Sequence, residues 1–162
     1  LPLIIFYTII MPIFSKFFFF KIFYFNYIFT IKDIVLIWFS QIISLGLIVN
    51  YFLKNLWGRA RPGDIIQFGG DEFFTPWYKV SSSCETNCSF VSGDSSVGFS
   101  IIVLYFITKN TFYVYASILM GLSLGLIRIM EGGHFLSDIF FAGIVVILFN
   151  LIFYKSLRKY EN

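Results

Sequence analysis

The chain has 162 residues, of which 58% are hydrophobic and only 13% are charged. A soluble domain of this length would carry about a quarter of charged residues, so the composition excludes an ordinary soluble domain and indicates an integral membrane protein. The net charge of +3 is small, and the basic residues are not gathered into a patch that would bind nucleic acid.

Five to six apolar segments approach the roughly 20 residues that a helix needs to cross a bilayer. We therefore expect an all-α fold, a polytopic membrane helical bundle of five to six transmembrane helices in a single domain over residues 1–162. Because Leu1 stands where a methionine would begin a chain, we expect some N-terminal residues to be missing. In chain order the predicted spans are Leu1–Phe14, Phe17–Ile31, Asp33–Leu53, Val97–Thr108, Phe112–Ile127 and Ile139–Tyr154. The second of these is short, so it could instead lie in the membrane interface.

The expected orientation follows from basic residues outside the candidate motifs. If six spans alternate, these residues fall on one side, which the positive-inside rule makes cytoplasmic; Lys16 is the exception. The one long polar loop, from Pro62 to Phe90, then faces outward. We expect a protein of a bacterial inner membrane with its functional residues on the periplasmic face. The residues that set this orientation are Lys32, Lys109, Lys155, Arg158 and Lys159.

Two cysteines lie in this outer loop as the segment CETNC. Cys84 and Cys88 are close enough along the chain to form a disulfide, and an oxidising compartment would favour that bond. A metal-binding pair is the alternative, but no second cysteine pair is present and the only histidine lies far along the chain. We expect a disulfide.

The first polar cluster is KNLWGRARP, at the outer end of the third predicted span. Cations at a helix end commonly extend to the membrane interface, but that explanation predicts them on the cytoplasmic side. These cations are instead expected on the outer side. Lys54 and Arg61 are seven residues apart, which is two helical turns, so we expect both on one helix face. Two cations just beyond the lipid tails would suit an anionic headgroup.

The second cluster is SFVSGDSS, which opens the fourth predicted span. Gly93 allows close approach of the backbone to a ligand, and the start of a helix offers free N–H groups to a phosphate. Ser92 or Asp94 could equally be an ordinary N-cap. This cluster alone is a weak signal.

The third cluster is IRIMEGGHFLSD, which contains the only histidine. On a helix, His134 and Asp138 would be i and i+4, so the carboxylate could hold the imidazole in one tautomer. A helix-capping histidine with flanking charges is the alternative. All three clusters fall at outer helix ends, and three cations around one anion could hold and polarise a phosphoryl group without a metal. The third cation would be Arg128.

This ordered pattern resembles the type 2 phosphatidic acid phosphatase superfamily, membrane lipid phosphatases related to vanadium haloperoxidases. The first family signature, Lys-x6-Arg-Pro, is complete here at residues 54–62. The third, Ser-Arg-x5-His-x3-Asp, is present except that Ile127 replaces its serine. The second, Pro-Ser-Gly-His, keeps only Ser92 and Gly93, because Val91 and Asp94 replace its proline and histidine. The resemblance covers about residues 33–154.

The resemblance implies a two-step phosphoryl transfer at the lipid surface. His134 would attack phosphorus and form a phosphohistidine, Asp138 would orient the imidazole, and water would release phosphate. No metal or organic cofactor is implied, and the partners are a lipid phosphate and the bilayer, with no nucleic acid and no obligate protein partner. The groups implied to bind the phosphate are Lys54, Arg61, Ser92, Gly93 and Arg128.

Asp94 is the main departure from the family pattern, in which a histidine gives a proton to the leaving oxygen. Asp94 could act as this acid, since apolar surroundings and a nearby phosphate help a carboxyl group to keep its proton. It could also be spared by a good leaving group, or leave the site impaired. We expect a phosphatase acting on lipid A, undecaprenyl pyrophosphate or a phospholipid. The alternatives are a lipid phosphotransferase with the same intermediate and an impaired lipid-phosphate binder.

Overall fold

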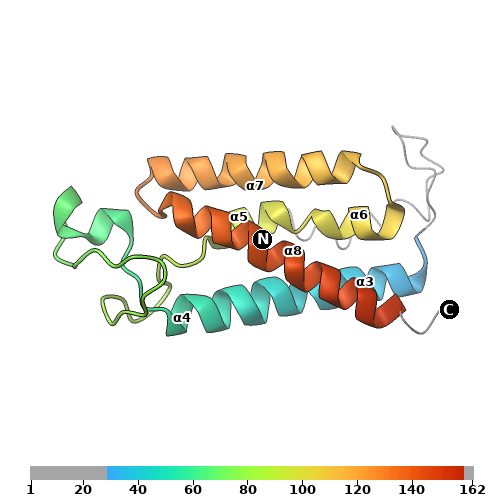
Figure 1. The fold of residues 1–162 in the computed structure, drawn as a ribbon, viewed down its shortest axis with the longest axis horizontal. Coiled ribbons are helices and arrows are strands. Elements are labelled where there is room, and N and C mark those ends of the chain that lie inside the picture. Colours follow the sequence, from blue (N-terminus) through green and yellow to red (C-terminus); the bar gives the residue numbers. More distant parts are fainter. Residues whose placement is uncertain (1–28, 159–162) are drawn as a thin grey trace.

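The computed structural model describes residues 29–158, which form a bundle of helices aligned along one long axis (Figure 1). The first pass is a continuous helical stretch built from α3 (Ile31–Gln41), the π-helical segment η2 (Ile42–Leu53) and α4 (Lys54–Leu56). It starts in a capping box, in which the side chains of Thr30 and Asp33 bond each other's backbone N–H groups.

A long loop follows this pass and forms one end of the bundle (Figure 1). Gly58 ends the helical stretch with φ of +62°, and a Cβ at this position would overlap the carbonyl oxygen of Ser81. The loop contains the short 3-10 turns η3 (Pro62–Asp64) and η4 (Ile66–Phe68). The ring of Trp77 packs 4.3 Å from that of Phe141, so the loop is fastened to the body of the bundle.

The remaining passes are α5 (Gly93–Phe99) with α6 (Ile102–Thr108), then α7 (Phe112–Met130), then α8 (Leu136–Arg158). Residues 29–158 therefore confirm the all-α prediction, since they contain helices and one isolated bridge between Ile65 and Glu72.

Within the described residues, three helices are long and apolar enough to cross a membrane, fewer than the five to six that we expected. They are Ile31–Leu56, Phe112–Met130 and Leu136–Arg158. The expected span Leu1–Phe14, and nearly all of the expected span Phe17–Ile31, lie outside the described residues.

The fourth expected span, Val97–Thr108, differs from the prediction. It is part of a shorter apolar stretch, Gly93–Thr108, which is divided into α5 and α6. At the division the hydroxyl of Ser100 donates to the carbonyl of Val97, and such side-chain bonds to the preceding turn weaken regular helix.

The interior of the bundle holds polar side chains among two apolar clusters, and much of its outside is apolar. Large apolar side chains are exposed along the spans, whereas Ser40, Ser44, Ser117 and Asn150 are buried and donate hydrogen bonds to backbone carbonyls. A Cβ on Gly98 would lie 2.6 Å from the backbone of α7, so this glycine permits the close approach of α5 and α7.

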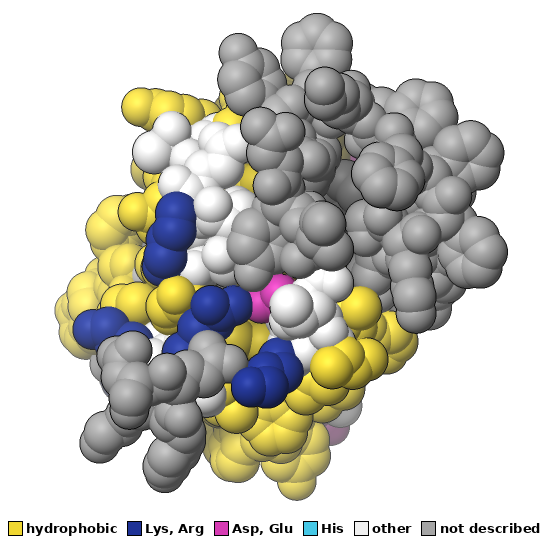
Figure 2. Space-filling view, turned by 90° about the vertical axis from the view of Figure 1, so that its right-hand side faces the viewer, with side chains coloured by type: hydrophobic (Ala, Val, Ile, Leu, Met, Phe, Trp, Pro, Cys, Tyr) yellow, Lys and Arg dark blue, Asp and Glu magenta, His cyan; other side chains and the backbone are white. Residues whose placement is uncertain are grey.

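Basic side chains gather at the end of the bundle opposite the long loop, where they surround an acidic group (Figure 2). This is the end that the positive-inside rule makes cytoplasmic. The described basic residues near the helix ends there are Lys32, Lys109, Lys155 and Arg158. Lys16 and Lys159 lie outside the described residues.

Candidate active site

The three sequence clusters all lie at the loop end of the bundle (Figure 1). Lys54 lies in the last turn of the first pass, Gly93 begins α5, and Arg128 lies in the last turn of α7. Asp138 lies in the first turn of α8. Alternating helix directions thus bring together residues that are up to 84 positions apart, from 54 to 138.

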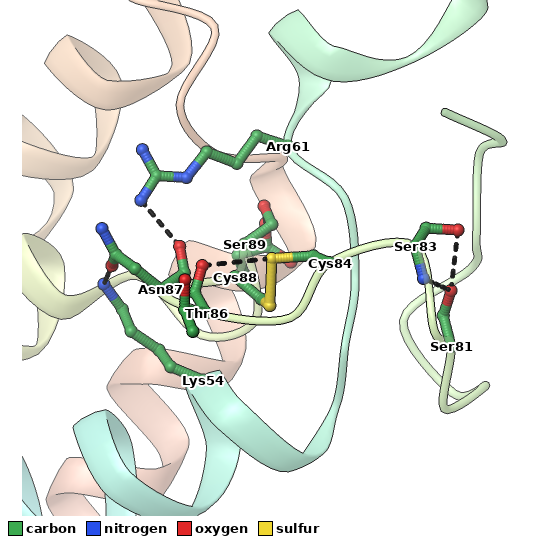
Figure 3. Close-up of a disulfide and its surroundings, with 10 residues drawn as sticks. Lys54, Arg61, Ser81, Ser83, Cys84, Thr86, Asn87, Cys88 and Ser89 are labelled. Atoms are coloured by element: carbon green, nitrogen blue, oxygen red, sulfur yellow. Dashed lines mark hydrogen bonds between the residues drawn. A yellow bond between two sulfur atoms is a disulfide. The ribbon is translucent and has the colours of Figure 1, made fainter. Parts of the chain in front are cut away.

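Lys54 and Arg61 do not share a helix face, contrary to our prediction. The helix ends at Leu56, and Arg61 has extended backbone dihedrals, φ of −77° and ψ of 158°. The two cations meet because both bond Asn87: Nζ of Lys54 donates to Oδ1 at 2.9 Å, and the guanidinium of Arg61 donates to the backbone carbonyl at 2.8 Å (Figure 3). A loop residue therefore brings the two cations together.

Asn87 lies in the short loop between Cys84 and Cys88, which are joined by a disulfide (Figure 3). Its φ of 52° lies in the left-handed region, which asparagine tolerates better than most residues. The disulfide loop therefore presents one residue to both cations of the first cluster. This role could not be predicted from the sequence, because an asparagine in a polar loop is ordinary.

The second cluster lies directly against the first. The Cβ position of Gly93 is 3.3 Å from Nζ of Lys54, so the start of α5 faces that ammonium group. Ser92 is fully buried and is the N-cap of α5, with its hydroxyl accepting from the N–H of Ser95 at 3.4 Å. The N–H of Ser92 donates to the carbonyl of Asp138 at 3.2 Å, which ties this cluster to the third.

Arg128 is held between two carboxylates. Its Nε donates to Asp94 at 2.5 Å and its NH1 donates to Glu131 at 2.6 Å. Asp94 and Arg128 are both within electrostatic reach of Lys54, and so is Arg61. The carboxylate that replaces the family histidine thus lies among the three cations that we predicted to bind phosphate.

His134 and Asp138 face each other, although not on one helix as predicted. His134 precedes the start of α8 at Leu136, and its Nδ1 lies 3.7 Å from Oδ2 of Asp138. This is longer than a hydrogen bond, and catalytic contacts are often loose until a substrate binds. The histidine side chain is 3% exposed, and within residues 29–158 its Nδ1 has no hydrogen-bond partner. Its side chain is therefore poised beside a carboxylate and away from bulk water.

Asp138 is fixed by groups that the sequence analysis did not assign to the site. Oδ1 accepts from NH1 of Arg59 at 2.5 Å, while Oδ2 accepts from the hydroxyl of Ser89 at 2.5 Å and the N–H of Phe135 at 2.9 Å. Burial lowers the pKa of Arg59 from its ordinary value, and the Asp138 carboxylate opposes that shift. Arg59 stands two residues before Arg61 in the first cluster, and the spacing alone does not tell which arginine faces a ligand.

Taken together, the site combines a histidine–aspartate pair with three cations and the N-terminus of a helix. Such an arrangement can hold an anion at several oxygens while a nucleophile approaches. Within residues 29–158, no group of three or more His, Cys, Asp or Glu side chains is arranged to hold a metal ion.

The PAP2 superfamily model matches residues 34–161, which contain all three clusters. The chain belongs to the PAP2 superfamily. It is 43% identical over 124 residues to a lipid A 4'-phosphatase of Francisella tularensis subsp. novicida (strain U112), covering 74% of this chain and 56% of that protein. It is 37% identical over 103 residues to a lipid A 4'-phosphatase of Rhizobium leguminosarum, covering 62% and 44%.

This PAP2 chain spans about half the length of the curated relatives that it matches. No solved structure matches it. The family assignment confirms the resemblance that the three clusters indicated, while the roles of the individual residues remain predictions.

Proposed function

We propose that this protein is a membrane lipid phosphatase that removes phosphate from a lipid at the outward-facing surface of its membrane. The observation that carries the proposal is that His134 faces Asp138 at the same end of the bundle as Lys54 and its neighbours Arg61 and Arg128 (Figure 1). The opposite end is rich in basic residues outside the motifs, which supports an outward-facing site. A bacterial inner membrane with a periplasmic site fits this orientation.

In the first step, the phosphate of the substrate takes its place among Lys54, Arg61 and Arg128. Nδ1 of His134 faces Asp138, which leaves Nε2 to attack phosphorus. A nitrogen–phosphorus bond forms, the bond to the lipid oxygen breaks, and the cations stabilise the charge on the remaining oxygens. The product of this step is a phosphohistidine.

During this step Asp94 would change from a partner of Arg128 to the group that protonates the leaving lipid oxygen. It is bound to Arg128, so an arriving phosphate must take that guanidinium from it. The freed carboxylate then accepts the proton of the phosphate monoanion and gives it to the lipid oxygen as the bond to phosphorus breaks. In the second step water attacks phosphorus, the nitrogen–phosphorus bond breaks, and Asp94 takes the proton of the water.

The proposed substrate is the 4'-phosphate of a lipid A molecule. Two relatives, at 43% and 37% identity, carry the name lipid A 4'-phosphatase. A sugar phosphate at the membrane surface would present its phosphate to the cations while its acyl chains stay in the bilayer. No metal is required by this mechanism, because the cations provide the positive charge.

The test is phosphate release by the full chain in mixed micelles that contain lipid A, with phosphatidic acid and undecaprenyl pyrophosphate as comparison substrates and a chelator present. We expect fastest release from lipid A, from its 4' position, and no release by His134→Ala. Release that persists in His134→Ala would overturn the phosphohistidine mechanism. Binding of lipid A without release by the unmodified protein would support the impaired binder instead.

A further inference from the structure

The group around Asp138 extends beyond the residues that the family signatures contain. Arg59 is 2% exposed, and its guanidinium makes three hydrogen bonds: to Asp138, to the hydroxyl of Ser137 at 2.8 Å and to the carbonyl of Thr75 at 2.8 Å. It also lies over the ring of Phe135, with Cζ 4.1 Å from the ring centre. These contacts leave Arg59 in a single position.

Ser89 completes the group from the other side of the carboxylate. It is fully buried, its hydroxyl bonds Oδ2 of Asp138, and its N–H donates to the carbonyl of Arg59 at 2.8 Å. Both side-chain donors to Asp138 are thus joined to each other as well. Their segments belong to the long loop, so the loop fixes the first turn of α8.

Oδ2 is the oxygen that matters for catalysis, because it is the one that faces Nδ1 of His134. A carboxylate that could rotate would present either oxygen, or neither, to the imidazole. Ser89, the N–H of Phe135 and Arg59 together permit one orientation. A buried carboxylate also needs a counter-charge to remain ionised, and Arg59 lies against it.

We propose that Arg59 and Ser89 are positioning residues for the proposed phosphatase reaction, which hold Asp138 in the one orientation that aligns His134. This inference rests on the proposed function. The two arginines of the segment GRARP then have different tasks. Arg61 bonds Asn87 beside Lys54, where phosphate would bind, while Arg59 points inward and bonds the Asp138 carboxylate. Arg59 does not touch the substrate.

The test separates the two arginines by kinetics with lipid A in micelles. Removing a residue that holds a metal ligand changes activity by about 10- to 100-fold, and we expect the same range for a residue that holds a catalytic carboxylate. We therefore expect Arg59→Met to lower kcat by about that factor while KM stays within about twofold. Arg61→Met should raise KM. Arg59→Lys should recover part of the lost kcat, because an ammonium group can still pair with Oδ1. An increase in KM for Arg59→Met like that for Arg61→Met would overturn the proposal.

Loss of folding is a competing explanation, and two further variants address it. Ser89→Ala removes one bond to Oδ2 and no charge, so it should fold and still lower kcat, by about threefold to tenfold. Arg158→Met breaks another arginine–aspartate pair, at the opposite end of α8, and should leave kcat unchanged. If Ser89→Ala keeps full kcat, the proposal is wrong even if Arg59→Met does not fold.

His134→Ala in the same experiment distinguishes failure of the positioning role from failure of the proposed function. If it is inactive and both Arg59→Met and Ser89→Ala are fully active, only the positioning role fails. If His134→Ala is as active as the unmodified protein, or the unmodified protein releases no phosphate, the proposed function fails and the positioning role fails with it.

Discussion

The two ends of α8 carry the same kind of ion pair in two different settings. Near its start, Asp138 pairs with Arg59 at 2.5 Å, and both side chains are at most 3% exposed. At its other end, Arg158 pairs with Asp33 at 2.5 Å, and that arginine is 34% exposed. Both aspartates are buried, so burial of a charge does not by itself mark a site.

The difference lies in what else each carboxylate contacts. Asp33 accepts from the N–H and the hydroxyl of Thr30 and so caps the first helix, which is a structural task. Asp138 instead faces His134 and receives bonds from the long loop. Only at the Asp138 end do a histidine beside the carboxylate and the cations beyond it indicate a function.

The largest difference between the two ends is expected when each aspartate is neutralised. Asp138→Asn should lower kcat by about 10⁴-fold, because the amide cannot hold the imidazole in the required tautomer. It should also reduce the free energy of unfolding by about 3–5 kcal/mol, since Arg59 remains buried without its counter-charge. The measurements are phosphate release from lipid A and thermal unfolding in detergent.

Asp33→Asn is the matched control at the other end. It should reduce the free energy of unfolding by about 1–2 kcal/mol, because its partner is partly exposed and part of the cap remains. It should leave kcat unchanged. A loss of kcat comparable to that of Asp138→Asn would mean that the Asp138–Arg59 pair has no greater part in catalysis than the Asp33–Arg158 pair.

The next largest effect concerns the cations. Lys54→Met and Arg61→Met should each lower kcat/KM by about 10²- to 10³-fold, because each removes a charge that stabilises the transition state. The control is Lys155→Met, which removes an exposed cation of the opposite end and should change kcat/KM by less than twofold. Equal losses in all three variants would indicate a general effect of charge on the protein rather than a phosphate site.

Asp94→Asn is expected to separate binding from proton transfer. The amide no longer competes for Arg128, so KM should fall by about threefold to tenfold, while kcat should fall by about 100-fold because the acid is lost. Glu131→Gln removes the other carboxylate from Arg128 and should lower KM without that loss of kcat. If Asp94→Asn keeps its kcat, Asp94 is not the proton donor.

The smallest expected effect is at the disulfide loop. Asn87→Asp adds a negative charge beside Lys54, which would compete with phosphate, so KM should rise by about threefold to tenfold. Asn110→Asp is the control, since Asn110 accepts from a backbone N–H at the start of α7, and an aspartate can do the same. An unchanged KM for Asn87→Asp would remove the disulfide loop from the phosphate site.

The sequence predicted the class of fold and the gathering of the polar clusters, because hydropathy and motif order are local and strong signals. It did not predict how the clusters meet. Lys54 and Arg61 were expected on one helix, but Gly58 ends that helix and Asn87 joins the two cations instead. Such contacts depend on the path of a loop, which periodicity does not determine.

Arg59 illustrates the same limit within a single motif. Two arginines are separated by a single residue, and only the three-dimensional path of the chain assigns one to Asp138 and the other to Asn87. The division of the Val97–Thr108 segment between α5 and α6 was similarly beyond a hydropathy reading, because apolar residues continue across it.

In the proposed mechanism, His134 carries the phosphoryl group during turnover. The most direct measurement is a rapid-mixing experiment with lipid A labelled with ³²P at the 4' position, quenched under alkaline conditions and followed by peptide mapping. We expect the label on the peptide that contains His134, formed before free phosphate is released and lost in His134→Ala. Release of labelled phosphate with no label on His134 at any time point would contradict the account.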